Sequence, residues 1–325
     1  MSRAASWRPS APPETLRARA AMLASIRAFF SERGLMEVET PLLSRAGTTD
    51  PQLESVTARV RALGEEPLYL MTSPELAMKR LLAAGCGDLY QIARVFRDGE
   101  LGRWHQPEFT LLEWYRTDWN EEALMTEVEA LLRRVVEAHR PLAPTVRLSY
   151  REAFQDHLDI DVFTDPDGLK ARLKAVGVDV PADLQDDGLM ELAFGAAITP
   201  RLDPDAIVFV YDFPQSQAAL ARIKPETPPV AARFEAFLGG VELANGFDEL
   251  TDAAEQRARF ETERAQRLID GRHAPPVDEA FLDALAHGLP RCAGVAVGLD
   301  RLLAVATGLK RVSEAMSFAH TSTDH

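Results

Sequence analysis

Apolar and polar positions follow two different periods along the chain, and together they predict a mixture of helices and strands. Apolar residues recur at helical spacing from Leu16 to Phe30, and Gly34 is a suitable end for that helix. Residues Met36 to Pro41 then read as a short strand that proline closes. The sequence Ser73-Pro74-Glu75 predicts a helix start with serine as N-cap, and that helix would run to Gly85.

The remaining pattern contains strands that lie far apart in the sequence, without a repeating strand–helix–strand rhythm. This predicts an α+β fold, in which an antiparallel sheet is flanked by helices. Strands are predicted at 88–96, 108–115, 207–212, 232–247 and 293–298, and helices at 120–139 with Asn120 as cap, after Thr251 and from Leu299.

The segment 141–229 is acidic and rich in proline, with helical pieces and one strong strand. It contains no recognisable chemistry, so we interpret it as a peripheral or inserted segment. The expected organisation is a single catalytic domain over residues 1–325.

Composition narrows the class of protein. A net charge of −14, from 36 basic and 50 acidic residues, argues mildly against broad nucleic-acid binding. Cys86 and Cys292 have no partner spacing, which argues against a disulfide framework and a zinc site. No apolar run is long enough to span a membrane, because Asp300 and Arg301 interrupt the longest one near the C-terminus. A cytoplasmic location is the expectation.

The stretch RVFRDGELGRWHQPEF, residues 94–109, concentrates charge at a strand–loop–strand turn. Arg97 ends the first strand, and Arg103 and His105 lie on the loop. Guanidinium groups offer a planar fork of donors, so this turn predicts a clamp for phosphate oxygens. The plainer alternative is a solvated hairpin with ion pairs.

The second strand of that turn continues as EFTLLEWY. Alternation puts Phe109, Leu111, Glu113 and Tyr115 on one face. A carboxylate on that face predicts recognition of a ligand cation, with Tyr115 as a wall. The alternative is an edge strand with a wet face.

A second group of residues follows Arg233. Glu235 and Glu242 lie on neighbouring strand segments across Gly239-Gly240, which reads as a hairpin turn. Facing carboxylates repel each other unless a cation lies between them, so the pair predicts a Mg²⁺ site that also uses substrate phosphates. The alternative is two exposed surface glutamates. Asn245 and Glu249 bracket a glycine turn, and Glu249 is a further candidate ligand-facing carboxylate.

The third group is GVAVGLDR, residues 294–301. Glycines on a strand let a ligand approach the backbone, and Arg301 begins the following helix. Tight packing is the alternative explanation.

Taken together, these stretches resemble the three signature motifs of class II aminoacyl-tRNA synthetases. GLMEVETPLL resembles motif 1, whose strand ends at Pro41 and forms the dimer; RVFRDGELGRWHQPEF resembles motif 2 and GVAVGLDRLL motif 3. TSPE, EFTLLEWY and ELANGFDEL are similar to the lysyl subgroup. The resemblance covers residues 14–139 and 230–317, roughly two thirds of the chain.

Lysyl-tRNA synthetases carry an anticodon-binding domain before the catalytic core, and the motif 1 helix here begins near residue 14. With TLLEWYR and ASWRPSA, the chain is therefore most similar to a family of bacterial lysyl-synthetase paralogues. That family uses ATP to join (R)-β-lysine to the ε-amino group of a lysine on elongation factor P. The resemblance implies ATP and Mg²⁺ as ligands, a homodimer, and no tRNA or membrane partner.

The resemblance also implies roles for individual residues in binding ATP. Arg97 and Arg301 are the candidate catalytic residues, with Arg97 on the α-phosphate. Arg103 and His105 would hold the outer phosphates, and Phe109 and Arg301 would sandwich the adenine. The implied Mg²⁺ ligands are Glu235 and Glu242, and further ATP contacts are implied for Asp98, Gly99, Glu100, Gln106, Glu242, Leu243 and Gly298.

Other residues would bind the amino acid. Ser73, Pro74 and Glu75 would lie at its backbone-side amine, and Asn245 near its carboxylate. The distal ammonium would be received by Glu113, Tyr115 and Glu249 with Phe247 as a wall, above a floor that contains Ala296.

Three positions depart from the synthetase pattern. Gly99 stands where motif 2 usually has a glutamate, with Glu100 one place later, and Gln106 replaces an asparagine. Ala296 replaces the middle glycine of motif 3. Two other functions compete with protein modification: a minimal lysyl-tRNA synthetase, and a catalytically inactive synthetase-like module that senses an amino acid. Gly99 is the feature that favours the inactive module.

Overall fold

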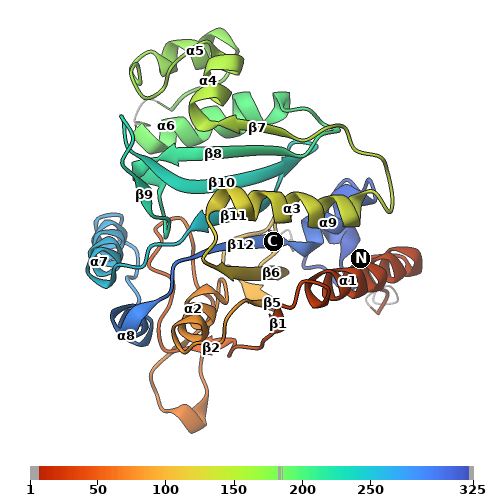
Figure 1. The fold of residues 1–325 in the computed structure, drawn as a ribbon, viewed down its shortest axis with the longest axis vertical. Coiled ribbons are helices and arrows are strands. Elements are labelled where there is room, and N and C mark those ends of the chain that lie inside the picture. Colours follow the sequence, from red (N-terminus) through yellow and green to blue (C-terminus); the bar gives the residue numbers. More distant parts are fainter. Residues whose placement is uncertain (1–6, 182–183, 185, 322–325) are drawn as a thin grey trace. The chain divides into compact units, whose positions relative to one another are not determined.

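The computed structural model describes residues 7–181, 184 and 186–321 (Figure 1). The chain divides into two compact units. Unit 1 is Met1–Asp118, Thr251–Arg291 and Ala296–His325, and unit 2 is Trp119–Leu250 and Cys292–Val295. Ala5 and Ser6, the first two residues of ASWRPSA, lie outside the described residues. Both units contain antiparallel strand pairs with helices packed on them, which confirms the predicted α+β class.

The main strands of unit 1 are the two that flank the motif 2 loop. β5 (Leu89–Phe96) and β6 (Glu108–Thr117) pair antiparallel along their whole length, with Gln91 opposite Glu113. Both strands match their predicted ranges within two residues. β1 (Met36–Glu37) adds parallel to β5, so the strand predicted at 36–41 is shorter than expected. A small second sheet has the order β2 (Leu43–Ser44), β4 (Leu68–Leu70), β3 (Thr57–Ala58).

Helix α1 (Pro13–Ser31) confirms the first predicted helix and packs on β5. Its Phe30 ring stacks on Tyr90 of β5 with 4.5 Å between the ring centroids. Gly34 follows the helix with a φ of +73°, a conformation that favours glycine. The other helical elements of unit 1 are α2 (Glu75–Ala83), α7 (Ala253–Ile269), α8 (Glu279–Gly288), α9 (Leu299–Ala306), and the 3-10 turns η2 (Arg61–Leu63) and η6 (Val312–Ala315).

Unit 2 is built on the hairpin of β10 (Val230–Leu238) and β11 (Val241–Asp248). Gly239 and Gly240 form its turn with φ values of +61° and +70°, so the predicted hairpin is confirmed. The segment 141–229 supplies further strands. β8 (Val208–Pro214) pairs with β10, while β7 (Val146–Ser149) pairs with β8 and β9 (Ile223–Lys224) with β10.

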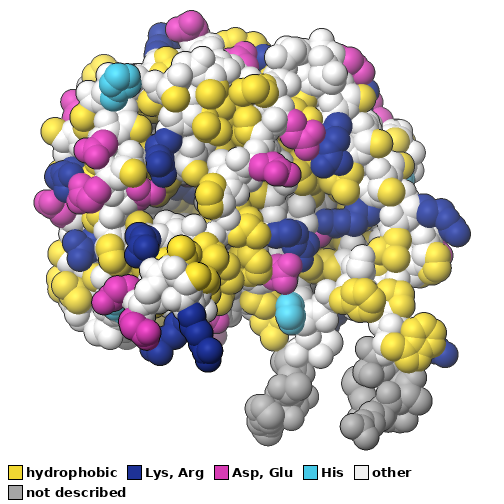
Figure 2. Space-filling model, turned by 90° about the horizontal axis from the view of Figure 1, so that it is seen from below, with side chains coloured by type: hydrophobic (Ala, Val, Ile, Leu, Met, Phe, Trp, Pro, Cys, Tyr) yellow, Lys and Arg dark blue, Asp and Glu magenta, His cyan; other side chains and the backbone are white. Residues whose placement is uncertain are grey.

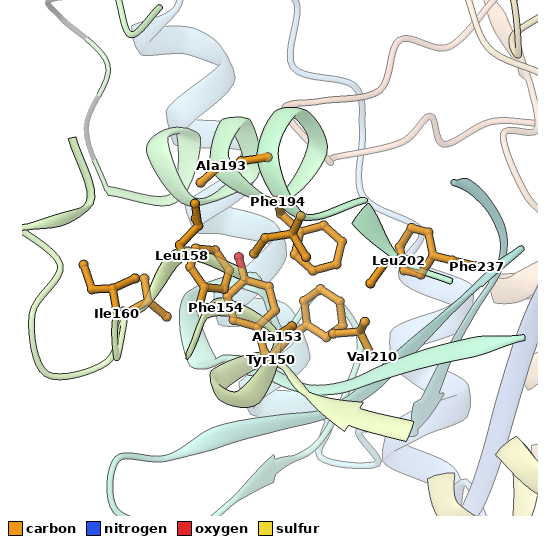
Figure 3. Close-up of a cluster of buried hydrophobic side chains, with 14 of the residues drawn as sticks. Tyr150, Ala153, Phe154, Leu158, Ile160, Ala193, Phe194, Leu202, Val210 and Phe237 are labelled. Atoms are coloured by element: carbon orange, nitrogen blue, oxygen red, sulfur yellow. The ribbon is translucent and has the colours of Figure 1, made fainter. Parts of the chain in front are cut away.

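Helices of unit 2 pack on one face of β8. Val208 and Val210 point toward a cluster of buried side chains from α4 (Tyr150–Leu158) and the helices after it, which Figure 3 shows around Tyr150, Phe154 and Phe194. Phe209 points to the other face, where it meets Phe234 of β10. The remaining elements are α3 (Glu121–Val136), α5 (Leu169–Ala175), α6 (Asp186–Ala193), the π-helical η3 (Phe194–Ile198), and the 3-10 turns η4 (Thr199–Arg201) and η5 (Gln215–Gln217).

Local capping explains where two helices of unit 2 begin. Asn120 accepts a hydrogen bond from the Ala123 N–H at 3.0 Å, which confirms it as the N-cap of α3. Ser149 and Glu152 form a reciprocal capping box at α4. Each cap satisfies backbone donors that a helix N-terminus otherwise leaves without partners.

The apolar character of the helices and the distribution of charge on the surface bear on possible membrane and nucleic-acid contacts. Among the described residues, no helix combines the length and apolar character that crossing a membrane requires. On the face drawn in Figure 2, basic side chains lie among acidic and hydrophobic ones. This mixture differs from the continuous basic stripe that is typical of broad nucleic-acid contact.

Candidate active site

Arg97 directly follows β5, and the turn of the motif 2 hairpin fixes its backbone. The Arg97 N–H donates to the Pro107 carbonyl at 2.9 Å, which closes the loop between β5 and β6. Its guanidinium lies 5.1 Å from the centre of the Phe109 ring, and Nε donates to the Thr72 carbonyl at 3.4 Å. The side chain is 25% exposed and only 3.8 Å from Glu100. A cation that is aligned yet accessible suits phosphate binding.

The motif 2 loop meets the start of α9. Arg301 Nε donates to the Trp104 carbonyl at 3.0 Å, and Arg301 Nη2 lies 2.8 Å from His105 Nε2. Because a guanidinium only donates, the histidine nitrogen accepts, which requires the neutral ring with its proton on Nδ1. Arg103 is exposed, and its Nε donates to the Lys310 carbonyl at 2.9 Å. Unit 1 thus brings His105 and Arg301 into direct contact.

Asp300 is a positioning residue to which the sequence assigned no role. It is 2% exposed and accepts hydrogen bonds from Arg19 Nη1 and from the Thr110 N–H, both at 2.6 Å. These bonds join the first turn of α9 to β6, and they fix the backbone that carries Arg301. An acidic residue in the first turn of a predicted helix, directly before an arginine, was the available signal.

The remaining motif 2 residues have structural partners of their own. Gln106 is buried, and its amide both donates to the His320 carbonyl and accepts from the His320 N–H, at 3.2 and 2.8 Å. Asp98 donates its N–H to the Glu54 carbonyl at 2.8 Å. Gly99 has a φ of +77°, so the turn itself explains why glycine stands there. The ATP contacts proposed for these residues and Glu100 stay predictions.

A hydrogen-bonded cluster that contains two carboxyl groups joins the start of α2 to β6. The prediction that Ser73 caps α2 was wrong, because Pro74 occupies the N-cap position. Ser73 Oγ instead accepts from the Glu75 N–H at 3.0 Å and donates to Glu113 Oε1 at 2.6 Å. Tyr115 donates its hydroxyl to Glu113 Oε2 at 3.3 Å. The predicted amine-binding residues Ser73 and Glu75 therefore adjoin the predicted ammonium-binding residues.

Glu113 and Tyr115 are each 2% exposed, so the alternative of a wet strand face was wrong. Burial, together with the Glu75 charge, raises the pKa of the Glu113 carboxyl to about 8 against the hydrogen bonds from Ser73 and Tyr115. The carboxyl is consequently mostly neutral at neutral pH. A cation that binds beside Glu113 would favour the ionised form of the carboxyl.

Lys79 also belongs to this cluster, although it was not among the predicted site residues. It is 1% exposed, and its Nζ donates to Glu75 Oε1 at 2.6 Å, one helical turn away. The glutamate-to-lysine spacing of four residues on a predicted helix was the signal. This ion pair holds the Glu75 carboxylate in one orientation beside Glu113.

In unit 2 the two candidate metal ligands do not stand opposite each other as predicted. Glu235 of β10 pairs with Asn245, whereas Glu242 of β11 pairs with Phe237. The two-residue turn sets this offset by placing Leu238 opposite Val241, and a bulge after Ala236 widens it by one residue. They still interact. Burial raises the pKa of Glu235 to about 7, with Arg233 opposing and Glu242 adding to the rise.

Two neighbouring carboxylates on one hairpin are suitable ligands for a divalent cation. Within the described part of the chain, no cluster of three or more histidine, cysteine or acidic side chains could hold a metal ion by itself. Mg²⁺ commonly uses one or two carboxylates together with substrate phosphates, so Glu235 and Glu242 fit such a site.

The register places Arg233, Glu235, Asn245 and Phe247 on one face of the β10–β11 hairpin. The predicted glycine turn between Asn245 and Glu249 was wrong, because β11 continues through Gly246. A Cβ at Gly246 would lie 2.4 Å from the Phe234 ring and 3.0 Å from the Gly294 carbonyl, so close packing requires this glycine.

Glu249 follows β11 and is 2% exposed, with its N–H donating to the Cys292 carbonyl at 3.0 Å. Leu243 is buried in β11. β12 (Cys292–Gly298) contributes Cys292–Val295 to unit 2 and its last residues to unit 1, where Ala296 packs against Ala93, Val95 and Leu111. Gly298 is the N-cap residue of α9.

Comparison with known proteins finds similarity along nearly the whole chain. Residues 2–322 match the family model described as tRNA synthetases class II (D, K and N). The chain is 47% identical to a protein of Klebsiella pneumoniae (strain 342) and 46% identical to one of Salmonella arizonae, over 98% of each chain in both cases. Both relatives are named elongation factor P–(R)-β-lysine ligase.

The match covers nearly the whole chain. The described residues include the motif 2 hairpin, Glu235 and Glu242 of the β10–β11 hairpin, and the motif 3 arginine Arg301. The chain belongs to the class II tRNA synthetase family of the D, K and N type.

Proposed function

We propose that this protein is an ATP-dependent ligase that activates (R)-β-lysine and transfers it to a lysine ε-amino group of elongation factor P. The observation that carries the proposal is the identity of 46–47% to ligases of that name along 98% of both chains. The cluster of carboxyl groups formed by Glu75 and Glu113 supports a substrate that carries an ammonium group far from its carboxylate.

The first step joins the amino acid to AMP. The substrate carboxylate is ionised at neutral pH and attacks the α-phosphorus of ATP. A mixed carboxylic–phosphoric anhydride, the acyl-adenylate, forms and pyrophosphate leaves. No general base is needed, so the protein contributes alignment and charge neutralisation. Arg97 would neutralise charge at the α-phosphate, and Phe109 and Arg301 would hold the adenine. Mg²⁺, when bound by Glu235 and Glu242, would supply further neutralisation of phosphate charge.

The second step transfers the acyl group. The neutral ε-amine of the acceptor lysine attacks the acyl carbon, an amide bond forms, AMP leaves with the bonding electron pair, and the amine releases a proton. Glu75, held by Lys79, and Ser73 would orient the substrate's amine nearest the carboxylate, while Glu113, Tyr115 and Glu249 would receive the distal ammonium. Asn245 would lie at the carboxylate end.

The two rival functions make different demands on the same residues. A sensor has no use for phosphate-binding residues, yet Arg97 lies accessible beside Phe109 and Arg301 contacts His105. Gly99 does not by itself indicate an inactive module, because the backbone conformation at this position favours glycine. A tRNA-charging enzyme would use the same activation step, so only the acceptor separates it from the proposed ligase. The homodimer, the cytoplasmic location and the single catalytic domain stay predictions.

The test is an acceptor competition. The protein is incubated with ATP, Mg²⁺ and radiolabelled (R)-β-lysine or α-lysine, in the presence of tRNA, of elongation factor P, or of both. The proposal predicts label on elongation factor P, with (R)-β-lysine preferred. Label on tRNA alone supports the synthetase, and absence of ATP–pyrophosphate exchange with every lysine isomer supports the sensor.

A further inference from the structure

Arg233 lies on β10 among the candidate ligand-binding residues of unit 2, and its side chain is largely enclosed. It is 17% exposed, and its guanidinium lies 4.4 Å from the centre of the Phe213 ring. Its register partner is Phe247, two residues from the pair formed by Glu235 and Asn245. Arg233 therefore shares a strand face with both of these polar residues.

Each arm of the guanidinium has its own acceptor. Nη2 donates to Glu235 Oε1 at 2.5 Å, Nη1 donates to the Gln217 carbonyl at 2.7 Å, and Nε donates to Asn245 Oδ1 at 3.2 Å. A planar group held at three points and stacked on a ring cannot rotate without breaking several contacts. Arg233 is thus a rigid element within the hairpin.

The chemistry of the Asn245 contact fixes the orientation of the amide. A guanidinium has donors only, so the Asn245 atom that it contacts must be the carbonyl oxygen. The amide nitrogen, with its two N–H donors, is then the atom left on the other side of the group. A carboxylate accepts hydrogen bonds and donates none, so it can bind that side and would be repelled by the oxygen.

We infer that Arg233 is a positioning residue that holds the Asn245 amide with its N–H donors toward the carboxylate of the bound amino acid. This inference rests on the proposed function, since it requires the amino-acid carboxylate to lie at Asn245. Arg233 itself does not touch the substrate. A merely structural Arg233–Glu235 pair would stabilise the hairpin without distinguishing ligands that bear a carboxylate from those that lack one.

The test compares two ligands of nearly the same shape. (R)-β-lysine carries a carboxylate, and the corresponding diamino alcohol carries a hydroxyl, which both donates and accepts and so tolerates either amide orientation. Binding of both is measured by calorimetry on wild type and on Arg233→Met. We expect the variant to lose affinity for (R)-β-lysine by about tenfold or more, the effect of losing a hydrogen bond to a charged group, and for the alcohol by less than about threefold.

Two further variants separate positioning from folding. Arg233→Lys keeps the charge beside Glu235 but has no second arm for Asn245, so it should show the same selective loss. Arg147→Met is the matched control in unit 2: Arg147 also lies over a phenylalanine, 5.6 Å from the Phe209 ring centre, and pairs with Glu129 at 3.4 Å. It should leave the affinities for both ligands unchanged.

A double substitution gives the decisive comparison. In an Asn245→Ala background, Arg233→Met should no longer change the ratio of the two affinities, because the amide that it orients is gone. The inference is overturned if a folded Arg233 variant loses the same affinity for both ligands. It is also overturned if the selective loss of affinity for (R)-β-lysine persists in the Asn245→Ala background. Neither result contradicts the proposed function. Wild-type protein that binds no lysine isomer overturns the proposed function, and the inference with it.

Discussion

Removing the ionisable carboxyl of Glu113 should change how many protons leave the protein when a lysine isomer binds. Burial and the nearby Glu75 charge raise the pKa of Glu113 to about 8, so the carboxyl holds its proton at neutral pH. The charged groups that act on it are Glu75 from α2 and Arg97 from the motif 2 loop, with hydrogen bonds from Ser73 and Tyr115. An ammonium group that binds beside Glu113 should favour the ionised carboxylate, so the carboxyl should lose that proton.

The magnitude follows from the pKa. With a value near 8, about nine tenths of the Glu113 carboxyls are protonated at about pH 7 and about one tenth at about pH 9. Binding should therefore release about 0.9 proton at the lower pH and about 0.1 at the higher. If only the carboxylate form binds the ammonium, the affinity should rise about tenfold over the same interval. The ligand ammonium, with an ordinary pKa near about 10.4, stays largely charged throughout.

Calorimetry in buffers of different ionisation enthalpy counts the released protons directly. The Glu113→Gln variant should release about 0.9 proton fewer than wild type at about pH 7. Its affinity for the lysine isomer should be lower than that of wild type and should change less with pH. Glu279→Gln is a surface control, because Glu279 is exposed and pairs with Arg257 instead. Equal proton counts for wild type and Glu113→Gln would refute the reasoning about Glu113.

Three further predictions concern other parts of unit 1. Arg97→Ala should lower ATP–pyrophosphate exchange by about a hundredfold or more while circular dichroism stays unchanged, because it removes charge stabilisation at the α-phosphate; activity within about threefold of wild type would contradict the motif 2 assignment. Ala296→Gly should raise kcat/KM for α-lysine relative to (R)-β-lysine by about tenfold in the same assay, because one methyl on the pocket floor discriminates amines one carbon apart; an unchanged ratio would reject this. Burial, with Asp50, raises the pKa of Glu263 to about 7, so its neutral form is favoured in the folded state. The stability of wild type relative to Glu263→Gln should then be greatest below about pH 4.5 and decline by about 3 kcal/mol as the pH rises to about 7, measured by denaturant unfolding; a pH-independent difference would contradict the burial argument.

The motif 2 hairpin was predictable because its signals are local. Charge at a turn between two alternating strands predicted β5 and β6 within two residues, and it correctly put Arg103 and His105 on the connecting loop. Asn120 and the Gly239-Gly240 turn were likewise read from the chemistry of one or two residues. Local backbone preferences decide these features, so the sequence alone suffices.

Other features depend on residues far away in the chain. Burial of Glu113 arises because β6 is enclosed in its unit, which alternation within one strand cannot reveal. The bulge after Ala236 moves the partner of Glu235 from Ala244 to Asn245, and a one-residue shift changes every opposing pair after it. Gly246 is required by the Phe234 ring and not by a turn. Tertiary contacts set all three, and so sequence patterns misjudged them.

The most direct test of the proposed ligase activity is the intact mass of elongation factor P after incubation with this protein, ATP, Mg²⁺ and (R)-β-lysine. The proposed activity predicts a mass increase of one lysine residue, on a lysine ε-amine located by peptide mapping, with no increase when ATP is omitted or Arg97→Ala replaces wild type. An unmodified elongation factor P, in a reaction in which the same enzyme charges tRNA with lysine, would contradict it.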